Sequence, residues 1–336
     1  MLRKHYTQNN DHIRFGIVGC GAITKIAYLP FFKTSTMAKL TCLVDKDESV
    51  ISAYNEHSNL RYVGTNVDDM FEYVDAVIVA TPNYQHFPIA KTCLENGKHV
   101  LCEKPLAITS QECKQLISIA KKNQTKLTVA HVRRFYQAAK KTKNLIYSEH
   151  FGPIKSFEFE EGTIFNWPAN SGFYFDKKLA GGGVLIDIGV HVLDLLLWWF
   201  GTRLRKVDYI DDNLGGVEAV AEINIQLSNN IEGSIKLSRL SILKNRYNIS
   251  FENGWIEWNP LFPKYFYIYD YRKKTKKTIK MSNDLPVIDM VEDFIFSIKH
   301  DRKPLVSGKD GLQVIELIEK CYQVRKPLPL EWLKKN

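Results

Sequence analysis

Short apolar runs alternate with longer polar segments over the first 130 residues of the chain. The apolar runs have the length of β-strands, and segments of helical character separate them. The runs are apolar on both faces, which is typical of strands that helices cover on both sides. We therefore expect an α/β fold whose first part is a doubly wound parallel sheet. Its strands are expected at residues 13–18, 40–44, 61–64, 75–80, 98–102 and 127–130.

The pattern changes after about residue 150. Residues 154–165 alternate as a long strand, a loop rich in Asn, Pro and Gly follows, and residues 184–200 have the pattern of a helix. Strands then dominate to residue 280, and helical signal returns at residues 286–299 and 311–324. This order predicts a large, open, mostly antiparallel sheet with helices on one face. We expect the other face to be rich in Ile, Tyr and Phe and to pair with another subunit.

The stretch from residue 13 to residue 45 has the layout of a dinucleotide-binding βαβ unit. Gly19 permits a tight turn after the first strand, and Gly21 lets a pyrophosphate approach the start of the next helix. Asp45 ends the second strand, 24 residues after Gly21, where its carboxylate can accept hydrogen bonds from a ribose. Thr24 stands where the motif usually has its third glycine, so a plain tight turn is the alternative.

Polar residues follow each predicted strand of the first sheet. Ligands of such sheets bind at the carboxyl ends of the strands, so these clusters are expected to meet in one crevice. The chain is thus expected to divide into a tail at residues 1–12, a nucleotide-binding Rossmann domain at residues 13–132 and a second α/β domain at residues 133–336.

The charge of the chain favours anionic small molecules rather than nucleic acid. The net charge is +9 over 336 residues, and the densest basic run covers residues 272–277. This run follows an aromatic strand, as the solvated tip of a hairpin would, and no nucleic-acid-binding motif accompanies it. A positive surface would attract an anionic substrate or cofactor.

The distribution of apolar residues and cysteines favours a cytoplasmic protein without a membrane span. The longest apolar run, residues 192–200, is interrupted by Asp194 and is too short to cross a bilayer. The first 11 residues lack the apolar core of a secretion signal. Most of the six cysteines lie in apolar runs without any CxxC pair, as expected of buried, reduced thiols.

Several motifs in order resemble those of the Gfo/Idh/MocA oxidoreductases. They are Gly-Cys-Gly-Ala-Ile at residues 19–23, Glu-Lys-Pro at 103–105 after Ala-Thr-Pro-Asn at 80–83, the glycine-rich entry and helix of residues 181–191, and residues 304–311. The resemblance implies a Rossmann domain followed by an α/β domain whose open sheet forms a homodimer or homotetramer. It also implies that NAD or NADP is used to oxidise or reduce a sugar, a cyclitol or a sugar nucleotide.

Three residues are candidates for the chemistry. Lys104 follows a strand, and the resemblance implies a cis bond to Pro105; its ammonium can stabilise negative charge on a substrate oxygen. Asp187 and His191 lie four apart in a helical stretch, so they share one face, and the carboxylate could orient the imidazole. Lys104 and His191 both remain candidates for the base, and a buried histidine satisfied by its helical neighbour is the structural alternative. Asp194, one turn further on, is expected to be a structural partner.

The family's pattern implies which residues hold the cofactor. Asp45 would bind the ribose and favours NAD, because a carboxylate repels a 2′-phosphate. Lys46 could accept that phosphate, so NADP stays possible. His86 could equally be a packing residue. The phosphates would lie on Gly19, Gly21, Ala22 and Ile23, the crevice would be lined by Thr81, Pro82, Asn83 and His86, and Glu103 with Lys104 would lie near the nicotinamide.

Four further residues are candidates for binding the substrate. Arg133 and Arg134 follow a strand of the first sheet, so one guanidinium could reach the crevice, and Trp167 and Tyr174 could stack on a sugar ring. Packing or surface roles are equally open for all four. No histidine or cysteine cluster has metal-ligand spacing, so no metal is expected.

The sequence therefore favours a dehydrogenase of a sugar, and the positive charge with the arginine pair favours a phosphorylated or nucleotide-linked one. A second hypothesis is a non-catalytic, nucleotide-sensing regulator on the same fold. A third is an enzyme of the same fold that acts on a non-sugar carbonyl or keeps its NAD through a redox-neutral reaction.

Overall fold

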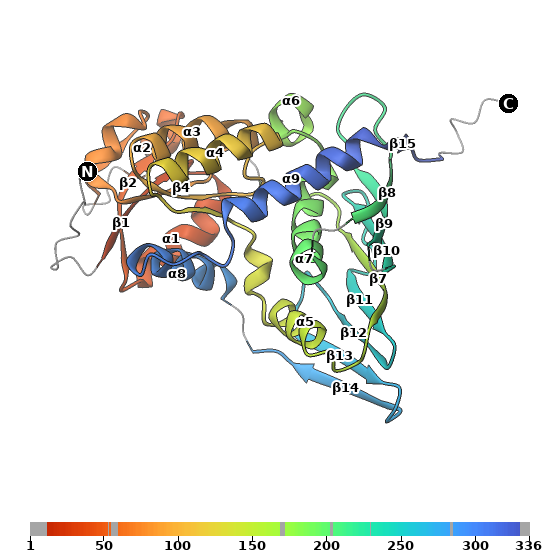
Figure 1. The fold of residues 1–336 in the computed structure, drawn as a ribbon. Coiled ribbons are helices and arrows are strands. Elements are labelled where there is room, and N and C mark those ends of the chain that lie inside the picture. The colour runs from red at the N-terminus through yellow and green to blue at the C-terminus, as the bar shows by residue number, and fades with distance from the viewer. Residues whose placement is uncertain are drawn as a thin grey trace.

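The computed structural model describes residues 12–52, 54, 60–168, 172–201, 204–228, 230–282 and 285–329. Residues 1–11 of the tail predicted at residues 1–12 lie outside the described residues. The described chain forms two sheets with helices between and beside them (Figure 1).

The first sheet is parallel and has six strands in the order β3-β2-β1-β4-β5-β6. Strand order reverses beside β1, because β2 and β4 flank it, and a ligand-binding crevice forms at such a point in open α/β sheets. The doubly wound sheet predicted from the apolar runs is confirmed. Its strands are β1 (Ile13–Val18), β2 (Ala38–Val44), β3 (Tyr62–Gly64), β4 (Ala76–Val79), β5 (His99–Cys102) and β6 (Leu127–Val129).

Helical segments join these strands and cover the sheet. The turn after β1 leads into a π-helical segment that continues as α1, and residues 68–73 form a short 3-10 segment. A capping box between Thr109 and Glu112 starts α4. The segments are η1 (Thr24–Tyr28), α1 (Leu29–Thr34), α2 (Glu48–Ser52), η2 (Asp68–Tyr73), α3 (Asn83–Glu95), α4 (Ser110–Lys122) and η3 (Val132–Phe135).

The second sheet has nine strands in the order β14-β13-β12-β11-β7-β10-β9-β8-β15. It is mostly antiparallel, as predicted, and among its described strands only the pairs β7–β10 and β8–β15 are parallel. Its strands are β7 (Ile154–Gly162), β8 (Leu204–Asp211), β9 (Val220–Leu227), β10 (Glu232–Ser238), β11 (Arg246–Phe251), β12 (Gly254–Trp258), β13 (Tyr265–Asp270), β14 (Thr275–Lys280) and β15 (Arg325–Pro327).

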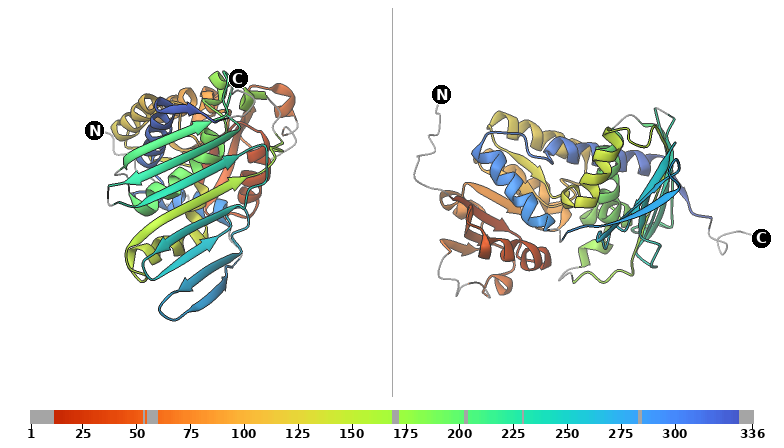
Figure 2. Two further views of the ribbon diagram at one scale, coloured as in Figure 1. Left: turned by 90° about the vertical axis from the view of Figure 1, so that its right-hand side faces the viewer. Right: turned by 90° about the horizontal axis from the view of Figure 1, so that it is seen from below.

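Helices cover one face of this sheet (Figures 1 and 2). Aromatic side chains make much of the contact. Trp199 of α7 meets Phe159 of β7 and Trp258 of β12 edge to face, with ring centroids 5.8 and 6.1 Å apart. The helical segments of this part are α5 (Gln137–Tyr147), for which the sequence analysis assigned no element, η4 (Gly172–Phe175), α6 (Lys177–Ala180), η5 (Leu185–Gly189), α7 (Val190–Phe200), α8 (Pro286–Lys299) and α9 (Gly308–Gln323).

The opposite face differs from the apolar face that we expected. The phenylalanines and isoleucines of the central strands are buried toward the helices, so the alternate, outward positions carry polar side chains. Arg246 there forms ion pairs with Glu158, Glu160 and Glu257. Aromatic residues gather only toward one end of this face, where Trp255 stacks on Tyr269. Figure 2 shows this face uncovered.

The last two helices connect the sheets. Helix α9 packs against both α4 and α7, and α8 packs against η3, with its Phe294 on Phe15 of β1. The helical stretch Lys177–Phe200 has the length and hydropathy of a membrane span, but 72% of its most apolar window is buried inside the structure. That burial is the property of a core helix.

Candidate active site

A cavity of about 760 Å³ lies at the carboxyl ends of the first sheet's strands and extends to the second sheet. It is bounded by the glycine turn after β1 at one end and by Glu161 of β7 and Arg239, just after β10, at the other. All predicted site residues but Arg134 line it. They are Gly19, Gly21, Ala22, Ile23, Asp45, Lys46, Thr81, Pro82, Asn83, His86, Glu103, Lys104, Arg133, Trp167, Tyr174, Asp187 and His191.

The glycine turn has the shape that a bound phosphate needs. Gly19 has φ +99°, and a Cβ there would lie 2.5 Å from the carbonyl oxygen of Ala80. A Cβ on Gly21 would meet no atom within 4 Å, so the space beside that backbone is open. The Thr24 hydroxyl donates to the Gly19 carbonyl oxygen at 2.6 Å. Thr24 therefore closes the turn with its side chain.

Asp45 supports the same turn. Its Oδ2 accepts a hydrogen bond from the backbone N–H of Cys20 at 2.7 Å, and its Oδ1 accepts one from the backbone N–H of Asp47 at 3.0 Å. Each carboxylate oxygen can accept a further bond, so a ribose hydroxyl could still be bound. Lys46 is exposed at the edge of the cavity.

Buried and partly buried polar contacts fix the two loops at the centre of the crevice. Glu103 accepts hydrogen bonds from the Tyr28 hydroxyl at 2.6 Å and from the backbone N–H of Lys104 at 3.1 Å, and burial raises its pKa. The ring nitrogens of His86 lie 2.6 Å from the Pro105 carbonyl oxygen and 2.8 Å from that of Thr81. His86 thus lines the cavity and also joins the loops, and burial lowers its pKa.

Asn83 connects the first sheet's part of the cavity to the second part. Its side-chain amide, at the start of α3, donates to the Ala180 carbonyl oxygen of α6 at 2.7 Å. The contact holds the start of α3 against the glycine-rich entry that follows α6.

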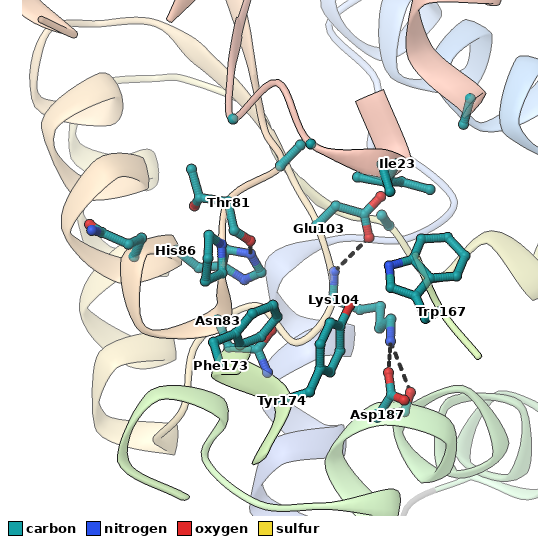
Figure 3. Close-up of a pocket in the computed structure, with 18 of the residues that line it drawn as sticks. Ile23, Thr81, Asn83, His86, Glu103, Lys104, Trp167, Phe173, Tyr174 and Asp187 are labelled. Atoms are coloured by element: carbon teal, nitrogen blue, oxygen red, sulfur yellow. Dashed lines mark hydrogen bonds and ion pairs between the residues drawn. The ribbon is translucent and has the colours of Figure 1, made fainter. Parts of the chain in front are cut away.

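Lys104, Asp187 and Arg239 form an ion-paired group, of which Figure 3 shows Lys104 and Asp187. The bond between Lys104 and Pro105 is cis, as the resemblance implied. The Lys104 ammonium donates to Oδ1 of Asp187 at 2.8 Å and to its carbonyl oxygen at 2.9 Å, while Arg239 lies 2.8 Å from Oδ2. Burial would raise the pKa of Asp187, but the two cations outweigh it and hold that pKa at about 2. Asp187 is therefore a permanent carboxylate at neutral pH.

The glycine-rich entry places Asp187 in this group. The Glu218 carboxylate accepts hydrogen bonds from the backbone N–H groups of Gly183 and Leu185, at 2.9 and 3.1 Å, and so caps the segment that begins there. A Cβ on Gly183 would lie 1.8 Å from the Glu218 carbonyl oxygen, so only glycine fits. Asp187 lies in the π-helical turn that follows, a conformation found often at functional sites.

His191 is near this group but is not held by Asp187 as expected. Both carboxylate oxygens of Asp187 are engaged by Lys104 and Arg239, and Nδ1 of His191 is buried without a hydrogen-bond partner in the described chain. Burial, with the positive charges of Arg133 and Lys104, holds the pKa of His191 well below its usual value. The imidazole is therefore neutral at neutral pH.

The two arginines after β6 are both paired with carboxylates. Arg133 lines the cavity, but its guanidinium binds Glu161 through two hydrogen bonds of 2.5 Å. Arg134 is buried away from the cavity, where it binds Asp194 and Asp310, so the substrate contact considered for it is not made. Asp194 is the structural partner that the sequence suggested.

Aromatic side chains form one wall of the cavity. Trp167 and Tyr174 come from the loop before the glycine-rich entry, and both lie beside Lys104 in Figure 3. The guanidinium carbon of Arg239 lies 5.2 Å from the ring centroid of Phe165 and 5.8 Å from that of Tyr174. The wall can thus offer both apolar ring faces and a fixed cation.

Three residues of the site were not identified from the sequence: Tyr28, Glu161 and Arg239. Each lies inside or beside a predicted strand or helix, without a motif of its own. The only local signal in the sequence is that Glu161 and Arg239 are polar residues at the ends of strands. Polar residues occupy the same position after the strands of the first sheet.

Comparison with known proteins agrees with this architecture. Residues 13–131 match the model of the Gfo/Idh/MocA oxidoreductase family, NAD-binding Rossmann fold, and residues 139–257 match the Gfo/Idh/MocA C-terminal domain. The crystal structure of aldose-aldose oxidoreductase from Caulobacter crescentus, complexed with glycerol, has a TM-score of 0.84 at 24% identity, covering 93% of this chain and 97% of that one. At this identity the likeness concerns the fold.

Two curated relatives are more similar in sequence over shorter stretches. Oxidoreductase P35 of Formosa agariphila is 29% identical over 204 residues, 57% of this chain and 61% of that protein. Glucose-6-phosphate 3-dehydrogenase of Bacillus subtilis is 28% identical over 252 residues, 68% of each chain. The chain thus spans less than two thirds of the first of these relatives. Because the two family models together match well over half of its residues, this chain belongs to the Gfo/Idh/MocA family of oxidoreductases.

Proposed function

We propose that this protein is an NAD(P)-dependent oxidoreductase that acts on a ring hydroxyl or carbonyl of a sugar. One observation carries the proposal. The Lys104 ammonium, fixed by Asp187, and the neutral imidazole of His191 line the same cavity as an open glycine turn that fits a pyrophosphate. A hydride reaction at a secondary alcohol needs a nucleotide site, an oxyanion-binding cation and a proton acceptor in one place.

The residues of the first sheet fit a dinucleotide. The open backbone at Gly21 would hold the phosphates, and the remaining lone pairs of Asp45 would accept the ribose hydroxyls. When bound, the nicotinamide accepts or supplies the hydride. The carboxylate of Asp45 favours NAD, and the exposed Lys46 leaves NADP as the second possibility.

The chain's own residues would handle the oxygen and its proton. Lys104 would donate a hydrogen bond to the reacting oxygen and stabilise its negative charge. Asp187 would keep the ammonium in place, since a carboxylate with a pKa of about 2 does not accept a proton at neutral pH. The neutral His191 would accept the hydroxyl proton during oxidation and return it during reduction.

The test combines cofactor titration with a sugar screen. Purified protein would be titrated with NAD and NADP, and reduced nicotinamide would be followed by absorbance with sugars, sugar phosphates, cyclitols and nucleotide-linked sugars. We expect turnover of one sugar class, reduced about 10²-fold or more in Lys104→Met. Lys91→Met, a partly exposed lysine of α3, is the matched control.

Each other outcome points to a different function. Nucleotide binding without turnover of any sugar would favour a regulator or a redox-neutral enzyme. Binding of neither nucleotide would refute the proposal at the glycine turn.

A further inference from the structure

Contacts on its ring hold Tyr174 in the aromatic wall of the cavity. It lies in η4, and its ring centroid is 4.0 Å from that of Phe173 and 5.5 Å from that of Phe165. The guanidinium carbon of Arg239 lies 5.8 Å from the same centroid. With these neighbours against it, the ring offers little open face on which a sugar could stack, whereas Trp167 is 40% exposed.

The hydroxyl is the part of Tyr174 that remains available to a ligand. It has no hydrogen-bond partner in the described chain, and it is not among the polar atoms that are sealed off there. The neighbouring carboxylates are already engaged. Both oxygens of Asp187 are paired with cations, and the two oxygens of Glu103 accept hydrogen bonds from Tyr28 and from the backbone of Lys104.

This hydroxyl is a donor and not a base. Figure 3 shows the ring of Tyr174 beside Lys104. Burial, with the negative charges of Asp187 and Glu103, raises the pKa of Tyr174, and the positive charge of Arg239 does not reverse this shift. The phenol therefore keeps its proton at neutral pH and can only offer it in a hydrogen bond.

The reacting oxygen of the substrate has room for a second donor. A hydroxyl oxygen can donate one hydrogen bond and accept two. In the proposed reaction His191 accepts the proton of this oxygen and Lys104 supplies one donor, so one lone pair is left. A lone pair without a donor costs free energy once the substrate has displaced water from the cavity.

We propose that Tyr174 is a catalytic residue whose hydroxyl donates a hydrogen bond to the reacting oxygen, alongside Lys104. In oxidation this bond strengthens as His191 removes the proton and negative charge develops on the oxygen. In reduction it stabilises the same charge before His191 returns the proton. No proton leaves Tyr174 in either direction. The inference rests on the proposed function and adds a residue to its site.

The first experiment removes only the hydroxyl. Tyr174→Phe keeps the ring and its packing, and it would be assayed with each sugar, sugar phosphate or nucleotide-linked sugar that the wild type turns over. We expect kcat to fall about 10- to 100-fold, with KM and NAD affinity close to wild type. The free energy of unfolding should not fall, because the hydroxyl has no partner in the described chain. Tyr147→Phe, at a 69% exposed tyrosine of α5, is the matched control.

The other outcomes of this experiment are distinct. Wild-type kcat in Tyr174→Phe would overturn the inference and leave the proposed function standing. A rise in KM alone would place the hydroxyl on another part of the substrate and would also overturn the catalytic role. A fall in the free energy of unfolding together with kcat would assign the hydroxyl a structural role instead. A wild type that turns over no sugar would refute the proposed function and this inference with it.

The second experiment uses pH to separate a donor from a base. Because its raised pKa keeps the hydroxyl of Tyr174 protonated, kcat of the wild type should show no basic limb between about pH 7 and 10 that is absent in Tyr174→Phe. Asp187, Glu103 and Arg239 are the charged groups that act on this hydroxyl, and each remains charged across that range. A basic limb that Tyr174→Phe abolishes would show that a phenolate forms, and would overturn the role as donor.

Discussion

Two partly buried groups that the sequence suggested as partners, Asp187 and His191, have separate environments. Asp187 lies between two cations and keeps its charge, with a pKa of about 2. His191 lies among positive groups with its Nδ1 buried, and its lowered pKa leaves the imidazole neutral. The spacing of four residues predicted that the two side chains would meet, but contacts from other elements decided the partners of Asp187. In this geometry Asp187 acts by holding the Lys104 ammonium.

The charge of Asp187 leads to the first prediction. Asp187→Asn leaves Lys104 and Arg239 without their shared anion, so Lys104 should no longer be held toward the substrate oxygen. We expect kcat to fall on the order of 10²-fold while NAD affinity, measured by titration, is retained. Because the pKa of Asp187 is about 2, the wild-type pH–rate profile should show no loss of activity attributable to this carboxylate between pH 5 and 8. An acidic limb in that range that disappears in Asp187→Asn would contradict the assignment.

At the scale of elements, the local sequence pattern predicted most strands and helices. The contacts that depend on pairing between distant parts of the chain could not be predicted from it. The glycine turn, the strands of the first sheet and the helix after the three glycines follow from periodicity and backbone chemistry within a few residues. The partners of Arg133 and Arg134 could not be predicted in this way. Glu161 is 28 residues from Arg133, and Asp310 is 176 residues from Arg134. Nothing local distinguishes an arginine that reaches a cavity from one that binds a distant carboxylate.

The prediction of an apolar outer face on the second sheet was wrong for a related reason. Alternation of apolar and polar residues gives two faces, and composition alone does not say which face each isoleucine or phenylalanine takes. Nearly all of these isoleucines and phenylalanines face the helices, and Arg246 with its glutamate partners lies on the outer face. The pairing of this face with another subunit stays a prediction, now for a polar surface with an aromatic end.

The two glycines of the turn have different roles, and this difference gives the next prediction. Gly19 relieves backbone strain, whereas Gly21 leaves space for a ligand. Gly19→Ala would place a Cβ 2.5 Å from the Ala80 carbonyl oxygen at φ +99°, so we expect a loss of roughly 1–3 kcal/mol in the free energy of unfolding. Gly21→Ala meets open space, so its stability should match wild type while its dinucleotide affinity falls about tenfold. Denaturant titration and nucleotide titration would measure the two effects.

Gly216→Ala, which also meets open space and lies away from the cavity, is the control for both variants. If Gly21→Ala bound NAD as tightly as Gly216→Ala does, the phosphates would not lie against this turn.

At the scale of the whole molecule, burial of neutral histidines ties stability to pH. Burial lowers the pKa values of four histidines, His86, His99, His131 and His191. The unfolded chain takes up protons at these rings below about pH 6.5, whereas in the folded chain their lowered pKa values keep the rings neutral to lower pH. The free energy of unfolding should therefore fall as the pH is lowered from 6.5. Glu103, whose pKa burial raises, acts in the opposite direction above pH 4.5.

His99 provides the sharpest test of this coupling. Burial, with the charge of Lys126, lowers its pKa to about 4, and its Nδ1 accepts the Lys126 backbone N–H at 2.9 Å. Between pH 6.5 and 4 it should contribute a slope of up to about 1.4 kcal/mol per pH unit to the free energy of unfolding. His99→Gln keeps an acceptor but cannot take up a proton, so its slope in denaturant titrations should be smaller by that amount. His300→Gln, at the exposed end of α8, is the matched control variant. Equal slopes of the free energy of unfolding against pH in the two variants would show that the acid sensitivity arises elsewhere. The histidines of the cavity would then be tested in the same way.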